Sequence, residues 1–143
     1  MRTLSNIVHE VIAIINNIDI FPVNAVSLFE SRLMDMPLYF PLAAVGINTA
    51  SLHTDKLSTY YRTSGGTEKY AVPADVELLI EIYLPHSASG YVNYDAACHI
   101  IFALMESNIQ VSDVSFGTMH YASTQICTVM PMTVKVHDRV CED

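Results

Sequence analysis

The stretch that most constrains the fold runs from residue 74 to residue 84, where two kinds of side chain alternate strictly. Every second position is large and aliphatic: Val76, Leu78, Ile80, Ile82 and Leu84. The positions between them include the carboxylates Glu77 and Glu81. A period of two residues predicts a β-strand, because successive side chains leave a pleated backbone on opposite sides. We therefore predict a central strand, ended by Pro85, with one face in the core and the other facing water or a partner.

Length and composition indicate a single domain that associates with other subunits. The 143 residues are enough for one domain with its own core. Apolar residues make up 51% of the chain and charged residues only 15%, a low charged fraction for the surface of a free monomer. Either other subunits cover part of the surface, or Ser, Thr, Asn and Tyr make it polar. We favour the first explanation, because exposed apolar area marks interfaces.

The net charge and the cysteines argue against several classes of protein. A charge of −8 disfavours wrapping nucleic acid through phosphate contacts, which needs clustered Lys and Arg. Cys98, Cys127 and Cys141 are an odd number without CxxC spacing, which indicates reduced thiols and not a disulfide framework. No stretch reaches the roughly 18 uninterrupted apolar residues of a membrane span. We expect a soluble protein without a targeting segment.

Two amphipathic helices are predicted, one on each side of the central strand in sequence. The first covers residues 3 to 18, and Thr3 or Ser5 caps its first turn. The second begins at Asn93 as its cap and ends near Ser107. Helical spacing predicts that its buried stripe consists of Ala97, Ile100, Ile101, Leu104 and Met105.

Two stretches before the central strand are expected to be strands. Residues 25 to 36 suit either a strand or a helix, and we favour a short edge strand that carries Glu30, Ser31 and Arg32. An extended connection between two prolines follows. Residues 42 to 53 then predict a strand of small residues, with Gly46 at a bulge or a close approach.

Two strands are also predicted after the second helix, at about 111–121 and 124–137. Pro131 cannot donate a hydrogen bond to a neighbouring strand, so the last strand should lie at an edge or be bulged there. A loose tail is expected from about residue 138.

Residues 55 to 72 are predicted to form a long polar loop, for which two structures remain open. A loop of this length in a compact domain is usually functional or disordered. Gly65 and Gly66 also suit a hairpin tip with strands on both sides. Basic and tyrosine side chains typical of contact surfaces gather here, and we predict them as a subunit or partner interface: Lys56, Tyr60, Tyr61, Arg62, Lys69 and Tyr70. The tyrosines could equally cover strand edges.

These elements predict an α+β fold in the order helix, strands, helix, two strands. One mainly antiparallel sheet should carry both helices on one face. A single domain is expected over residues 1–143, with no internal repeat and no low-complexity tract.

The sequence predicts neither a catalytic site nor a site for a metal or cofactor. Glu77 and Glu81 are about 13 Å apart along a strand, more than the roughly 5 to 9.5 Å between glycosidase carboxylates. They are therefore expected to be solvated or interfacial. Cys98 and His99 are adjacent, so they point about 100° apart on a helix. His137 and Cys141 lie where no helix is predicted. We expect a protein that is not an enzyme.

Three local patterns resemble the tail terminators of tailed bacteriophages, also called tail completion or minor tail proteins. The first is Phe29-Glu30-Ser31-Arg32-Leu33 followed by residues 37–45, which is similar to the early strands of that family. The second is the strand 76–85 with its proline-marked exit. The third is the helix from Asn93 followed by a pair of strands. The resemblance covers roughly residues 3 to 137.

The resemblance implies a virion subunit that assembles in the host cytoplasm into a ring, expected to be a hexamer. Such a ring caps the tail tube, ends its polymerisation and offers the surface for head–tail joining. Its partners would be the tail-tube protein and connector or neck proteins, with no membrane and no cofactor. Genomic DNA would pass through without specific binding, and Glu77 and Glu81 would line an acidic channel or an interface. The chain departs from the family in its longer 55–72 loop and in Pro131.

Two other functions stay open. Another ring component of a phage neck or tail end, a connector or adaptor, would differ mainly in its partner. A small α+β enzyme or metabolite-binding domain belongs to a different class. A purified monomer with a buried, polar-lined pocket would favour that class, whereas a ring of uniform stoichiometry would favour the structural role.

Overall fold

The centre of the fold is strand β4 (Glu68–Pro85), which contains the alternating stretch and begins before it. The computed structural model describes residues 3–18, 24–27, 41–54, 60–62, 66, 68–85, 90–123 and 127–141. The aliphatic side chains of β4 at positions 76, 78, 80, 82 and 84 are buried, and Pro85 ends the strand as predicted. β2 (Leu42–Leu52) and β7 (Cys127–Cys141) pair with β4 on either side, both antiparallel to it.

The sheet is mixed, with the strand order β1-β2-β4-β7-β5. β1 (Asn24–Ser27) runs parallel to β2, and β5 (Gln110–Phe116) runs antiparallel to β7. Two short strands extend it: β3 (Tyr60–Arg62) pairs with β4, and β6 (His120–Ala122) pairs with β7. The α+β class is confirmed, but β3 was predicted only in the hairpin alternative, β6 was not separated from the strand at about 111–121, and the β1–β2 pair departs from the antiparallel sheet. Residues 28–41 are long enough for the crossover that a parallel pair requires.

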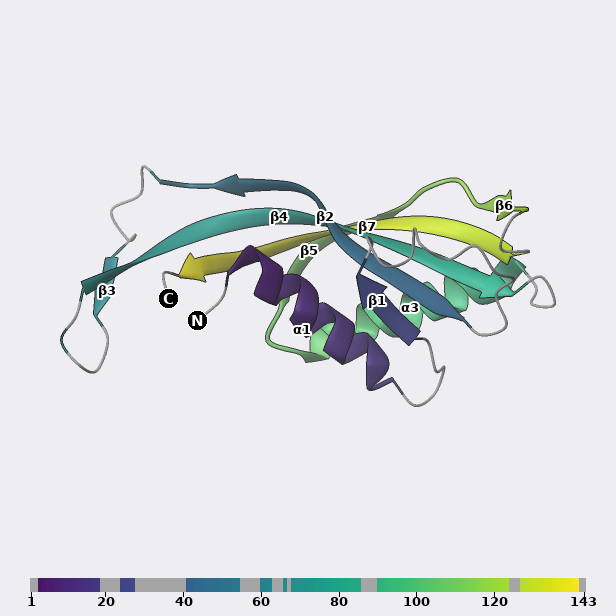
Figure 1. The fold of residues 1–143 in the computed structure, drawn as a ribbon, viewed down its shortest axis with the longest axis horizontal. Helices are drawn as coiled ribbons and strands as arrows, with labels where there is room; N and C mark the ends of the chain where they lie inside the picture. Colours follow the sequence, from purple (N-terminus) through teal and green to yellow (C-terminus); the bar gives the residue numbers. More distant parts are fainter. Residues whose placement is uncertain are drawn as a thin grey trace.

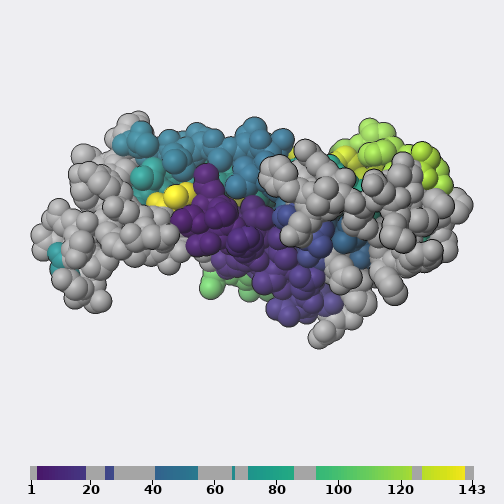
Figure 2. Space-filling model, in the orientation of Figure 1, coloured from purple at the N-terminus to yellow at the C-terminus, as the bar shows by residue number. Residues whose placement is uncertain are grey.

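Helices α1 (Leu4–Asn16) and α3 (Gly90–Glu106) lie on the same side of the sheet (Figure 1). Thr3 caps α1 by accepting a hydrogen bond from the backbone N–H of Asn6 at 3.3 Å. α1 lies across the middle of the face in Figure 2. Its buried side chains form one core cluster with those of α3, β4 and β7. Burial of this apolar face is the main force that holds the layers together.

The other side of the sheet is not covered by any helix among the described residues, and we call it the open face. It carries the side chains of β4 and β7 that alternate with the core positions: Asp75, Glu77, Leu79, Glu81, Tyr83, Thr133, Lys135 and His137. The prediction that one face of the central strand lies in the core is therefore confirmed.

Asn93 is a buried residue of α3 and not its cap, because the helix begins at Gly90. Its Nδ2 donates to the carbonyl oxygen of Ile82 at 3.3 Å, and its Oδ1 accepts from the hydroxyl of Thr128 at 3.1 Å. A buried amide needs such partners, since an unsatisfied polar group in the core is costly. The side chain therefore fixes α3 to β4 and β7.

Part of the predicted 55–72 loop is strand. β3 pairs with the start of β4 in an antiparallel register from Tyr60↔Tyr70 to Arg62↔Glu68, which confirms the hairpin alternative. Gly66 lies near its tip with φ of 79°, a left-handed conformation that glycine adopts readily. We use the term arm for β3, residues 68–73 of β4 and residues 138–141 of β7. The arm extends beyond the helices in Figure 1.

β7 corrects two predictions about the end of the chain. Residues 138–141 are not a loose tail, because they pair with residues 71–74 of β4. Of the two alternatives predicted from Pro131, an edge strand and a bulge, the edge strand is wrong, since β5 and β6 pair with the other side of β7. Pro131 is accommodated because it falls between the β5 and β6 pairings, where no ladder donor is required. Its carbonyl oxygen accepts a hydrogen bond from the N–H of Gly117 at 2.7 Å.

Candidate functional site

The open face places charged side chains of β4 opposite partners on β7. Glu77 lies opposite Lys135, and Asp75 lies opposite His137, in the antiparallel register. Cross-strand neighbours of opposite charge stabilise a sheet modestly. The charged residues of this face therefore occupy the strand positions between the buried aliphatic residues of the core.

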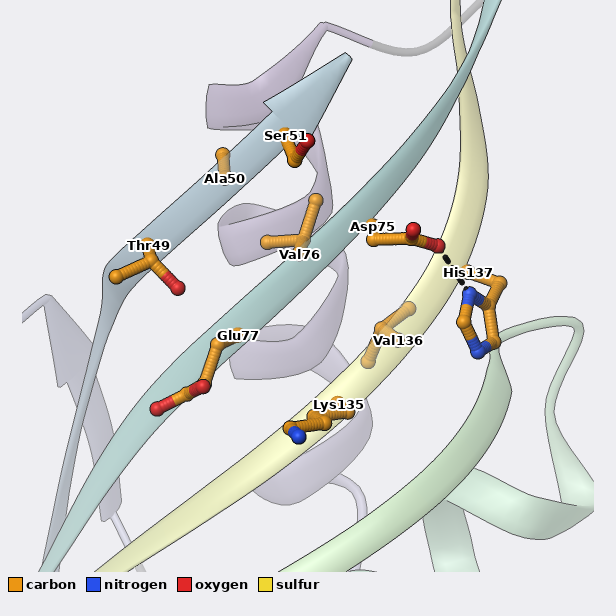
Figure 3. A pocket seen from close by; sticks show the side chains of 9 residues that line it. All are labelled: Thr49, Ala50, Ser51, Asp75, Val76, Glu77, Lys135, Val136 and His137. Atoms are coloured by element: carbon orange, nitrogen blue, oxygen red, sulfur yellow. Dashed lines mark hydrogen bonds and ion pairs between the residues drawn. The ribbon is translucent and has the colours of Figure 1, made fainter. Parts of the chain in front are cut away.

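Asp75 is held between two histidines that come from different strands. The Nε2 atom of His53, just after β2, lies 2.6 Å from one carboxylate oxygen of Asp75. Nδ1 of His137 on β7 bonds the other oxygen (Figure 3). The backbone N–H of His53 donates to the carbonyl of Pro73 at 2.9 Å, which extends the β2–β4 ladder and positions the ring.

This arrangement changes the acidity of the carboxyl group. Hydrogen bonding from His53, and then from His137, lowers the pKa of Asp75 below its ordinary value. The carboxylate therefore stays ionised and connects the end of β2 with β4 and β7.

A hollow of about 310 Å³ lies beside this cluster on the open face. Figure 3 shows its lining side chains on three adjacent strands: Thr49, Ala50, Ser51, Asp75, Val76, Glu77, Lys135, Val136 and His137. Carboxylates, an ammonium group, an imidazole and hydroxyls together suit polar contacts. The volume is at the lower end of the range for small-molecule sites, roughly 300–1,000 Å³.

Glu77 and Glu81 both lie on the open face, where different neighbours hold them. Oε1 of Glu77 accepts a hydrogen bond from Nδ2 of Asn48 at 2.9 Å. Glu81 accepts one from the hydroxyl of Tyr83. Asn48 is the irregular residue of β2, between Ile47 and Thr49, so the bulge predicted at Gly46 lies two residues further on.

No group of three or more His, Cys, Asp and Glu side chains among the described residues is arranged to hold a metal ion. His137 and Cys141 are both on β7, where four residues span about 13 Å. Cys98 is exposed and Cys127 is buried, and both carry free thiols. Burial raises the pKa of the Cys127 thiol, which keeps it protonated as a packing residue.

The predicted interface residues gather on the arm. Tyr60, Tyr61 and Arg62 form β3, while Lys69 and Tyr70 lie opposite them on β4. Strand pairing thus brings together five residues that lie on both sides of Gly66 in sequence. Lys56 lies outside the described residues, as do Glu30, Ser31 and Arg32 of the predicted edge strand.

The outer side of α3 is a second surface, which the sequence prediction missed. Met105 was predicted to be buried and is 64% exposed, Ile101 is only partly buried, and the predicted burial of Ala97, Ile100 and Leu104 is confirmed. Phe102 is 61% exposed. We use the term outer stripe for the exposed residues Tyr94, Cys98, Phe102 and Met105.

A groove of about 740 Å³ runs between the outer stripe and the end of α1. Its walls are partly apolar and partly polar: Ile14, Asn17, Ile18, His99, Phe102, Ala103, Glu106 and Ser107. At the other end of the stripe, the ring of Tyr94 meets that of Phe116 edge to face, with centroids 5.9 Å apart. The apolar surface of the helix layer therefore continues beyond the stripe at both ends.

Sequence reasoning did not find the cluster of His53, Asp75 and His137. The two histidines are separated from Asp75 by 22 and 62 positions, so only the register of β2, β4 and β7 brings them together. The outer stripe did leave a signal, because residues 90–106 contain neither Lys nor Arg.

Comparison with known proteins assigns no family to this chain: no protein-family model matches it, and no curated protein sequence matches it. Within the described residues, each helix is too short or too polar to cross a membrane.

Proposed function

We propose that this protein is a structural subunit of a ring at the head-proximal end of a bacteriophage tail. The ring ends tail-tube polymerisation and provides the surface for head–tail joining. The observation that carries this proposal is the two-sided sheet, which has helices on one face and the carboxylates Asp75, Glu77 and Glu81 on the open face. A channel through which DNA slides requires a wall that repels phosphates, and a net charge of −8 is suited to that task.

The residues that carry the resemblance to tail terminators support the same proposal. Residues 42–45 lie in β2, and the strand 76–85 lies in β4. The helix and the two strands that follow correspond to α3, β5 and β7. These elements are joined in one sheet and one helix layer, as a subunit of that family would be.

In the proposed ring, which we expect to be a hexamer in the virion, the subunit acts by assembly and without a catalytic step. One side of the ring binds the tail-tube protein, and the other binds connector or neck proteins. DNA passes through the centre without specific contacts. A head-to-tail contact between identical subunits that closes on itself is the symmetry such a ring requires.

Mass photometry and negative-stain imaging of the purified protein test this proposal. We expect rings of one stoichiometry that bind the ends of tail tubes. A phage lacking the protein should make tails of uncontrolled length that do not join heads. A chain that stays monomeric at high concentration and ignores tail tubes would contradict the proposal. Rings that bind connectors but not tubes would indicate the related role of a neck component.

The hollow beside Asp75 supports a second candidate, a small-molecule-binding domain. Its charged side chains, set among apolar ones, and its volume of about 310 Å³ suit a small molecule with polar groups. A monomer whose melting temperature rises with a polar metabolite, and whose Asp75→Ala variant loses that rise, would favour this candidate. The ring proposal predicts no such ligand.

A further inference from the structure

We propose that the arm of one subunit docks on the outer stripe of α3 of the next subunit, which deepens the proposed ring function and rests on it. The first observation is that α3 is apolar on both sides. Its inner side buries Ala96, Ala97, Ile100 and Leu104. Its outer stripe places Tyr94, Cys98, Phe102 and Met105 at spacings of four, four and three residues along one face. An exposed apolar stripe of this kind marks an interface, so a partner is expected to cover this side.

The charges around the outer stripe define the partner. Asp95 and Glu106 are exposed on α3 beside the stripe. Neither α1 nor α3 contains Lys or Arg, and the basic side chains of these two helices are those of His9 and His99. A segment that covers the stripe should therefore combine aromatic or apolar side chains with basic ones.

The arm combines tyrosines and three basic residues with two acids, Glu68 and Asp138. Among the described residues the Lys and Arg positions are 62, 69, 135 and 139, and all but Lys135 belong to the arm. Tyr60, Tyr61 and Tyr70 lie on the same paired strands as Arg62 and Lys69. Because the arm extends beyond the helices of its own subunit, it is placed to reach a neighbour (Figure 1).

Charge also argues against the simplest alternative, a symmetric pair of α3 helices. Antiparallel packing centred on the outer stripe would bring Asp95 of one copy within about one turn of Glu106 of the other. Like charges at that spacing repel. Docking of the arm on the stripe avoids this repulsion, and it joins two different surfaces of identical subunits, which is the type of contact that builds rings.

A mixing experiment tests the head-to-tail contact. One variant, Phe102→Glu with Met105→Glu, keeps the arm and loses the stripe. The other, Arg62→Glu with Lys69→Glu, keeps the stripe and loses the arm. Each variant alone should raise the concentration needed for assembly by at least about 30-fold. Mixed together, they should form a one-to-one dimer by native mass spectrometry, because one intact junction remains.

Two controls and three outcomes make the test decisive. Tyr121→Glu, an exposed aromatic outside both surfaces, and the charge-keeping pair Arg62→Lys with Lys69→Arg should assemble as the wild type does. If the wild type forms rings and both broken variants do too, the docking is wrong and the ring function stands. If each is monomeric and the mixture does not pair, the contact is not head to tail. If the wild type never assembles, the ring function itself fails.

Crosslinking gives a readout that does not depend on tolerating acidic substitutions. Single cysteines at positions 60, 61 and 62, in a Cys141→Ser background, should form an intersubunit disulfide with the exposed thiol of Cys98 under mild oxidation. Cys98→Ser should abolish that band. Rings that give no crosslink from any of the three positions would overturn the proposal.

Discussion

Asp75 shows how the fold gives a surface carboxylate a defined environment. One histidine partner, His53, lies just after β2 and the other, His137, lies on β7, and each bonds a different carboxylate oxygen. These bonds lower the pKa of Asp75, so the ionised form is favoured more strongly in the folded chain than in the unfolded one. The cluster therefore contributes stability that depends on pH.

The sign of this dependence can be tested with Asp75→Asn. The contribution should be fully present above the ordinary carboxyl pKa of about 3.9 and should be lost as the pH falls through the lower pKa of the folded state. We expect the variant to have a lower urea midpoint than the wild type at pH 7, with a difference that shrinks below pH 4. Asp113→Asn, whose carboxylate only accepts its neighbour's backbone N–H, is the control. A difference that does not change with pH would show that the carboxylate charge is not involved.

At the residue scale, the sequence predicted burial well wherever apolar residues recur at a single regular spacing, that of a strand or that of a helix. The aliphatic face of β4 and the burial of Ile100 and Leu104 follow directly from spacing. Met105 was misplaced because α3 is apolar on both sides, so periodicity alone does not tell the inner side from the outer. The sequence does not distinguish the buried amide of Asn93 from a helix cap, because asparagine serves in both positions.

At the scale of elements, the junction of β5, β6 and β7 depends on one close approach. The N–H of Gly117 donates to the carbonyl of Pro131, and a Cβ atom built at Gly117 would lie 2.7 Å from Cγ of Pro131. A proline ring cannot move aside as a long flexible side chain can. Glycine at this position lets the chain leave β5 and return as β6 beside the same strand.

Gly117→Ala should therefore destabilise the protein by about 1–3 kcal/mol, the usual cost of overpacking. Chemical denaturation measures this change, and Thr118→Ala next to it, which is exposed, should stay within about 0.5 kcal/mol of the wild type. Combining Gly117→Ala with Pro131→Ala should recover part of the loss. Additive effects in that double mutant would show that the two residues are not coupled.

The elements themselves were predictable to different degrees. α1, β2 and β4 follow from period and turn signals. The parallel pairing of β1 with β2 was not predictable, because the direction of a short strand leaves no mark on its composition. A loose tail is predicted from about residue 138, yet residues 138–141 pair with β4, a long-range contact that a short stretch of sequence does not reveal. For residues 55–72, the sequence likewise left two alternatives open, a long loop and the hairpin that forms part of the arm.

At the scale of the whole molecule, the two sides of the sheet are suited to different contacts. The helix layer offers the outer stripe and its acids, while the open face offers Asp75, Glu77 and Glu81 with Lys135 among them. In the proposed ring, the first surface faces a neighbouring subunit and the second faces the channel. Substitutions confined to the open face should therefore leave ring assembly intact, and substitutions confined to the outer stripe should leave the charge of the channel wall unchanged.

The double reversal Glu77→Lys with Glu81→Lys tests the second surface. The side chains are not in the core, but the reversal removes the hydrogen bonds from Asn48 and Tyr83 and places like charge opposite Lys135, so we expect a loss of about 1–3 kcal/mol in unfolding free energy. Rings should still form, but they should bind DNA in low salt and release it as salt rises, since added lysines attract phosphates. The phage carrying the double mutant should lose infectivity. Gel shifts and plaque counts measure both effects, and a fully infectious mutant would remove these residues from the channel wall.

The pairing of β4 with β7 also has a consequence for synthesis on the ribosome. Pro85 pairs with Cys127, and Ala71 pairs with Cys141, so the partner of β4 is made 42 to 70 residues later. At roughly 5–20 residues per second, translation from the end of β4 to the start of β7 takes about two to eight seconds. During that interval β4, whose aliphatic face belongs to the core, has one unpaired edge. The nascent protein is then most exposed to aggregation and most dependent on chaperones, and only chains that extend through β7 can complete the sheet.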